Sequence, residues 1–152
     1  MKHSASIRRS ARMRRQLQGA LRALLRWEMA IRSSAFTAAN VPASHASALL
    51  LGILIDARNQ LSTRLVELGS RSAVDDARQL TTVRTHVGRR RAYSGSPLIE
   101  ICVRACRSLG RAFGSAFREA QRLADLVSAH ILYGPLRQLE KQLWVLNPSQ
   151  NG

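Results

Sequence analysis

The N-terminus of this 152-residue chain carries a dense set of cations. Residues 1–15 contain no acid, and the first acidic residue is Glu28. Such a segment can neutralise phosphates without reading base sequence, because nothing here resembles the recognition helix of a defined DNA-binding motif. We expect residues 1–15 to form a flexible arm, helical at most in its last turn, that binds DNA. A solvated tail without a ligand and a transit peptide have similar compositions and stay open as alternatives. The predicted phosphate contacts are Lys2, Arg8, Arg9, Arg12, Arg14 and Arg15.

A second set of cations recurs at helical spacing between residues 104 and 122. At 100° per residue these arginines fall within about 60° of one another, so a helix would display them as a one-sided ridge. The formal net charge of +15 also fits a polyanionic partner, although an arginine-rich proteome with solvated basic faces gives the same total. We favour the arm over this ridge and over the basic loop at Arg89–Arg91 for DNA contact. The ridge consists of Arg104, Arg107, Arg111, Arg118 and Arg122.

Residue types that bind metals are sparse. Cys102 and Cys106 lie four residues apart, and no other cysteine is present to build a disulfide framework. With His130 they would supply three zinc ligands, but a fourth is not apparent and cysteines at this spacing usually pack in a core. We expect reduced core thiols. No phosphate-binding glycine loop, catalytic triad or suitably spaced carboxylate pair appears, and we assign no catalytic residue.

A long helix is predicted over residues 43–69, with Ser44 as its cap and Gly69 at its C-terminal end. Leu49 to Ile55 is apolar on every side, whereas a surface helix needs only one apolar stripe. We therefore expect this part to be buried on two sides, at the interface of a homo-oligomer. The apolar block is far shorter than the ~20 residues of a membrane span, so no membrane partner is expected.

Three further helices are predicted around this one. The first covers about residues 16–34, and the second begins at Ser96 and Pro97. The third covers residues 124–147, where Gly134 and Pro135 predict a kink or a division into two shorter helices. The link from 70 to 96 is long enough to let the third helix run parallel to the second, and residues 72–80 could form a short helix within it. The expected fold is an all-α four-helix bundle over residues 16–147, between the arm at 1–15 and a tail at 148–152.

The end of the chain resembles the last helix of the Dps proteins, mini-ferritins named for DNA protection during starvation. Their Ala-Asp-Ile-Leu segment is followed by Leu-(Asp/Glu)-Lys-x-Leu-Trp-Phe, and SAHILYGPLRQLEKQLWVLN is similar, with His130 in place of the aspartate. RLVELG at 64–69 and AFREA at 116–120 also resemble segments of that family. The resemblance implies a ferritin-like bundle with a short helix in the crossover, and assembly into a closed shell, which in that family is a dodecamer. It further implies a stress-response protein in the cytoplasm, associated with the nucleoid.

The residues that bind iron in Dps proteins have no counterparts here. The resemblance places a His-Trp-Asn segment near Ala35, Phe36 and Thr37, and the other ligands at Ser47, Leu51, Ser62 and Val66. Iron prefers carboxylate oxygen and imidazole nitrogen, which these side chains do not supply. Iron is therefore implied by the family alone, and we assign no cofactor with confidence.

Three functions follow from these observations. We favour a DNA-binding Dps-like protein that has lost its ferroxidase ligands. An iron-storing protein with relocated ligands is the second, with His45, Asp56 and Glu67 acting across a subunit interface. Within one chain, each of these residues is eleven positions from the next along a helix, a distance of about 16 Å at 1.5 Å per residue. They therefore cannot share an ion in one subunit. A helical bundle that binds only other proteins is the third.

Overall fold

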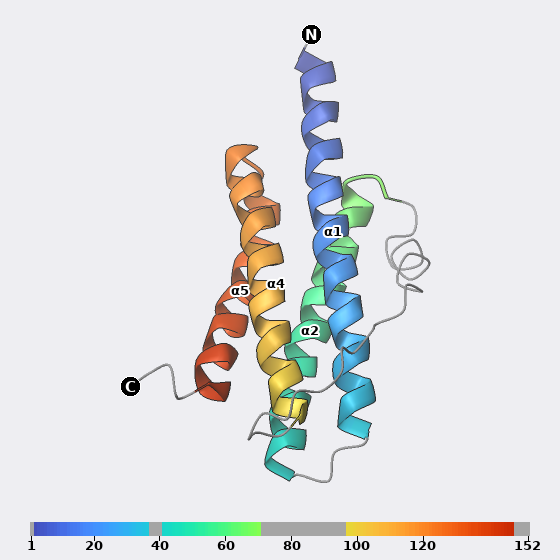
Figure 1. The fold of residues 1–152 in the computed structure, drawn as a ribbon. Helices are drawn as coiled ribbons and strands as arrows, with labels where there is room; N and C mark the ends of the chain where they lie inside the picture. The colour runs from blue at the N-terminus through green and yellow to red at the C-terminus, as the bar shows by residue number, and fades with distance from the viewer. Residues whose placement is uncertain (1, 37–40, 71–96, 148–152) are drawn as a thin grey trace.

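The chain folds into a bundle of long helices (Figure 1). The computed structural model describes residues 2–36, 41–70 and 97–147. These ranges contain four helices and no strand: α1 (Lys2–Phe36), α2 (Val41–Glu67), α4 (Pro97–Arg122) and α5 (Leu126–Leu146). The predicted all-α class and the four helices of the bundle are confirmed.

The helices alternate in direction except across the long link. α1 runs antiparallel to α2, α4 runs parallel to α2, and α5 returns antiparallel to α4 (Figure 1). The parallel course of α2 and α4 is the one expected from a link of this length. α1 packs against α2 and α4, and α5 closes the bundle against α4 and α2. Each helix thus contributes one stripe to a shared core.

Apolar stripes from all four helices form this core. In α4 most of the buried side chains are small, and Phe113 is also fully buried. Small residues at most of these positions let neighbouring helices approach closely, and the single large ring fills the space that remains. The buried residues of α4 are Leu98, Cys102, Ala105, Cys106, Leu109, Phe113, Gly114, Ala116 and Ala120.

α1 begins earlier than predicted. The helix starts at Lys2, so the expectation that residues 1–15 would be helical only in their last turn is wrong. Met13 is 1% exposed and lies in the core cluster, which means that packing against the bundle begins before residue 16. Burial of one large side chain contributes roughly 2 kcal/mol, which stabilises the helix around residue 13.

α2 ends as predicted but starts two residues early. The N–H of Gly69 donates to Val66 and that of Ser70 to Leu65, both at 2.9 Å, while Gly69 has a φ of 92°. This is a Schellman end, which requires a residue in the left-handed region. At the other end α2 begins at Val41, so Ser44 lies within the helix and the predicted cap is wrong.

The turn between α4 and α5 uses the same geometry without a glycine. Ala124 has a φ of 56°, and the N–H of Asp125 donates to the carbonyl of Ala120 at 2.9 Å. Asp125 then caps α5, which starts two residues later than expected. α5 is a single helix with Pro135 inside it, so the alternative of two shorter helices is wrong.

Several predictions concern residues outside the described ranges. They are the short helix at 72–80, the start of the next helix at Ser96, the loop at Arg89–Arg91 and the tail at 148–152. In the described ranges, no helix is long and apolar enough to cross a membrane.

Candidate nucleic-acid interface

The predicted arm forms the first turns of α1. Its first turns project beyond the ends of the other helices (Figure 1). Residues 3–9 are all exposed, and even the apolar Ile7 is 59% exposed. Among the predicted phosphate contacts, Arg14 is half-buried and Lys2 lies in the first turn of the helix. The exposed members are Arg8, Arg9, Arg12 and Arg15.

Because α1 is continuous, the cations of the arm share a face with those of the bundle. At 100° per residue, five arginines of α1 fall within about 80° of one another. The stripe of Met13, Leu17, Leu21 and Leu24 lies on the opposite side of the helix and is buried. The arginine face therefore points away from the core. We call this set the α1 ridge: Arg8, Arg12, Arg15, Arg22 and Arg26.

We call the ridge predicted between residues 104 and 122 the α4 ridge. It lies on the side of α4 opposite the buried residues of that helix. Arg104, Arg111 and Arg118 are exposed and Arg107 is half-buried. Within the described part of the chain none of these four has a carboxylate partner, so their charges are available to an external anion. Arg122 differs, because it forms two hydrogen bonds with Glu119 at 2.7 and 2.9 Å.

The two ridges meet at Glu119. Its carboxylate pairs with Arg122 of α4 and also with Arg12 of α1. The hydrogen bond from Arg122, with the charge of Arg12 beside it, holds the pKa of Glu119 below its usual value. One carboxylate thus pairs with two guanidiniums. The sequence does not predict the pair with Arg12, because Arg12 and Glu119 are more than a hundred positions apart in the chain.

Charge is divided unequally between the two helix pairs of the bundle. α1 and α4 pack together and carry 14 basic and 3 acidic residues, a net charge of +11. α2 and α5 carry 4 basic and 3 acidic residues, a net charge of +1. Fields of one sign on one face concentrate ligands of the opposite charge there. The α1–α4 side is therefore the candidate interface for a polyanion.

Comparison with solved structures identifies the architecture. A Dps protein from Vibrio cholerae O1, described as a member of a broad superfamily of ferritin-like diiron-carboxylate proteins, superposes with a TM-score of 0.78 over 95% of this chain and 92% of its own, at 15% identity. The chain has the Dps fold. Antigen TpF1 from Treponema pallidum is also similar, with a TM-score of 0.74, 16% identity and 95% coverage of both chains. No family model matches the sequence, and comparison with curated proteins finds no match.

The likeness in fold confirms the predicted ferritin-like bundle. Several residues that the resemblance places at the iron-binding positions of Dps proteins lie within the described ranges. Ala35 is half-buried and Phe36 is 94% exposed, and neither offers a metal ligand. The hydroxyl of the buried Ser47 donates to the carbonyl of Ser44 at 2.9 Å. The buried hydroxyl of Ser62 has no hydrogen-bond partner, and a lone neutral hydroxyl cannot replace a carboxylate. The residues present here do not fit a diiron-carboxylate centre.

The other metal candidates are not assembled either. Across residues 2–36, 41–70 and 97–147, no three His, Cys, Asp or Glu residues gather where they could hold an ion. His45, Asp56 and Glu67 are exposed along α2, and Glu67 pairs with Arg64. Cys102 and Cys106 are buried, as expected of core thiols, whereas His130 is exposed. Burial raises the pKa of Cys102 to about 11 and that of Cys106 to about 12, so neither is a thiolate at neutral pH.

Proposed function

We propose that the protein binds DNA non-specifically through the cations at the start of α1, and that it belongs functionally with the DNA-binding Dps-like proteins in the nucleoid. The projection of this segment beyond the bundle, with its arginines exposed, is the observation that carries the proposal. A projecting helix can approach a duplex without steric conflict from the rest of the molecule. Its guanidiniums lie on the solvent side, where they can replace the counterions of phosphates. The proposal includes no base-specific contact.

The test is the salt dependence of binding to a fluorescent duplex. Replacing Arg8, Arg9 and Arg15 with glutamine removes three exposed charges and should reduce the slope of log affinity against log salt by up to about 2.7, at about 0.9 per phosphate. Substitution is preferable to deletion of residues 1–15, which would also remove the buried Met13. The control is R137Q/K141Q on α5. An unchanged slope in the triple variant, with helical content intact, would reject the arm as a DNA contact.

Iron storage is the second candidate, since the similar Vibrio protein is described as a diiron-carboxylate relative. We expect the purified protein to oxidise ferrous iron no faster than the uncatalysed rate, with oxygen or with peroxide. The reason is chemical: alanine, serine, leucine and valine stand where carboxylates and histidines would be needed. Stopped-flow absorbance after addition of ferrous iron gives the rate. Saturable, protein-dependent oxidation would restore the relocated-ligand hypothesis.

We also propose that the chain forms a homo-oligomer through α2. Leu49 is 49% exposed and Val66 59% exposed, while Leu51, Ile53 and Ile55 are half-buried in the single chain. At 100° per residue, Leu49 and Ile53 lie on one flank of the buried stripe of α2, and Leu51, Ile55 and Val66 lie on the other flank. The helix thus has apolar surface on two sides, as the sequence predicts for an interface between copies of the chain. The alternative of a bundle that binds only other proteins would use the same helix with a different partner.

A further inference from the structure

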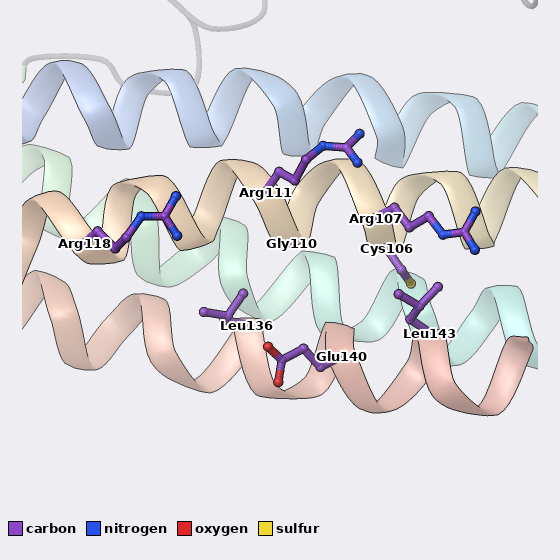
Figure 2. Close-up of a pocket in the computed structure, with 8 residues that line it drawn as sticks. All are labelled: Cys106, Arg107, Gly110, Arg111, Arg118, Leu136, Glu140 and Leu143. Carbon is purple, nitrogen blue, oxygen red and sulfur yellow. The ribbon is translucent and has the colours of Figure 1, made fainter. Parts of the chain in front are cut away.

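A groove runs between α4 and α5 below the α4 ridge. It has a volume of about 470 Å³, with Arg107, Arg111 and Arg118 on the α4 side and Leu136, Glu140 and Leu143 on the α5 side (Figure 2). Gly110 lies between the arginines, and nothing lies within 4 Å of the position that a Cβ would occupy there. The missing side chain at Gly110 therefore keeps the α4 side of the groove open.

The charges around this groove are unbalanced. Among the described residues that line the groove, Glu140 is the only acid, against three guanidiniums, and it forms no salt bridge with them. Leucine side chains form much of the opposite wall. Cationic groups on one side and an apolar wall on the other suit a ligand with phosphates along one edge and less polar groups along the other.

The spacing of the arginines selects an extended ligand. From Arg107 to Arg118 the helix rises about 16 Å at 1.5 Å per residue, so a single phosphate cannot contact all three. One DNA strand presents a phosphate about every 3.4 Å of axis, so about five phosphates would pass over this length. We infer that the α4–α5 groove is a second DNA site, in which one phosphodiester strand follows α4 from Arg107 to Arg118. This deepens the proposed function, but it rests on residues that the arm proposal does not use.

The test compares matched pairs in the full-length protein. R107Q/R111Q should reduce the salt slope for a fluorescent duplex by up to about 1.8, at about 0.9 per phosphate. R137Q/K141Q removes the same charge from the part of α5 outside the groove lining and should have less than half that effect. Gly110→Leu adds a side chain to the groove without changing charge. It replaces a helical glycine with a good helix former, so the variant should fold, and its DNA affinity should fall at least threefold.

Each outcome separates this site from the arm. Equal losses in R107Q/R111Q and R137Q/K141Q would mean a general charge effect and would overturn the groove. Loss only in R8Q/R9Q/R15Q would also overturn it and leave the arm as the DNA contact. Loss only in the groove variants would support the groove and reject the arm. Inorganic triphosphate is the remaining probe: if it binds in an Arg107-dependent manner while DNA binding is indifferent to the groove variants, the ligand is a small polyphosphate and the DNA assignment is wrong.

Discussion

Glu119 is the residue that limits the charge available on the α1–α4 side. It accepts from Arg122 and pairs with Arg12, so it occupies the position at which a phosphate would bind both guanidiniums. A second ion pair lies on the other side of α1 and is buried. Glu28 is 5% exposed and accepts a hydrogen bond from Arg58 at 2.7 Å, which joins α1 to α2. The first contact competes with a ligand, and the second holds the fold together.

We therefore expect Glu119→Gln to strengthen DNA binding. The neutral amide no longer competes with phosphate for Arg12 and Arg122, so the salt slope should become steeper by about 1 to 2. Anisotropy titrations of a labelled duplex at several salt concentrations would measure it. Glu67→Gln is the control, because it makes the same charge change on α2 beside Arg64. Weaker binding by the Glu119 variant would mean that the carboxylate positions the arginines productively.

Ala124 is a residue under conformational strain. Its φ of 56° lies in the left-handed region, which costs an L-residue roughly 1–2 kcal/mol. Ala124→Gly removes this cost but gives the unfolded chain more entropy, so we expect a net gain of about 0.5 to 1 kcal/mol in the free energy of unfolding. Urea denaturation would measure the change. Gly69→Ala, at the equivalent position of α2, should destabilise by a similar amount, and a loss of stability in both variants would contradict this account.

At the scale of the elements, a polar network ties the end of α2 to the start of α5. Arg64 donates to both oxygens of Asp125, at 2.9 and 3.1 Å, and to the hydroxyl of Ser128 at 3.0 Å. Asp125 in turn accepts from the N–H of Ser128 at 3.0 Å, which caps α5. Burial alone would raise the pKa of Asp125, but the hydrogen bonds from Ser128 and the charge of Arg64 outweigh it and lower the pKa.

This lowered pKa makes the contribution of Asp125 depend on pH. An aspartate has a pKa of about 3.9 in the unfolded chain, so its stabilising effect is complete well above that pH and is lost as the pH falls through the lower value of the folded state. Asp125→Asn keeps a capping side chain but loses the charge, and should cost about 2 kcal/mol at pH 7. Unfolding curves of both proteins between pH 7 and about pH 2 should converge at the acid end. A constant difference would show that the charge of Asp125 contributes nothing.

At the scale of the whole molecule, the bundle has two dissimilar sides. The α1–α4 side carries a net charge of +11, whereas the α2–α5 side carries +1 and exposes large apolar side chains. DNA binding through α1 and self-association through α2 would then use different surfaces. The exposed apolar residues of the second side are Leu49, Val66, Leu126, Val127, Tyr133, Trp144 and Val145.

We expect Leu49→Glu to weaken self-association. A charge at the centre of an apolar contact between two copies would have to be buried without a partner, which costs several kcal/mol. Multi-angle light scattering at micromolar concentration should show an oligomer for the native chain and a shift to monomer for the variant. Duplex binding by the monomeric variant should keep its salt slope. A native protein that is monomeric under these conditions would contradict the assignment of α2 to an interface.

The sequence by itself determined the number and nature of the helices and the core of the bundle. Helical spacing of apolar residues predicts which side of each helix is buried, and this period does not depend on distant contacts. The resemblance to Dps proteins places alanine, leucine and valine at iron-binding positions, and these residue types supply no metal ligand in any conformation. The arginines of α4 could be placed on one ridge for the same reason, since a ridge is a property of one helix.

Only the tertiary structure decided which of these features lie together. The extension of α1 to Lys2 was not predicted, and the burial of Met13 shows that contact with the other helices begins before residue 16. The contact of Arg12 with Glu119, the network around Asp125 and the groove beneath the α4 ridge all join residues far apart in the sequence. Their existence depends on how the helices are packed, and helical periodicity carries no information about that choice.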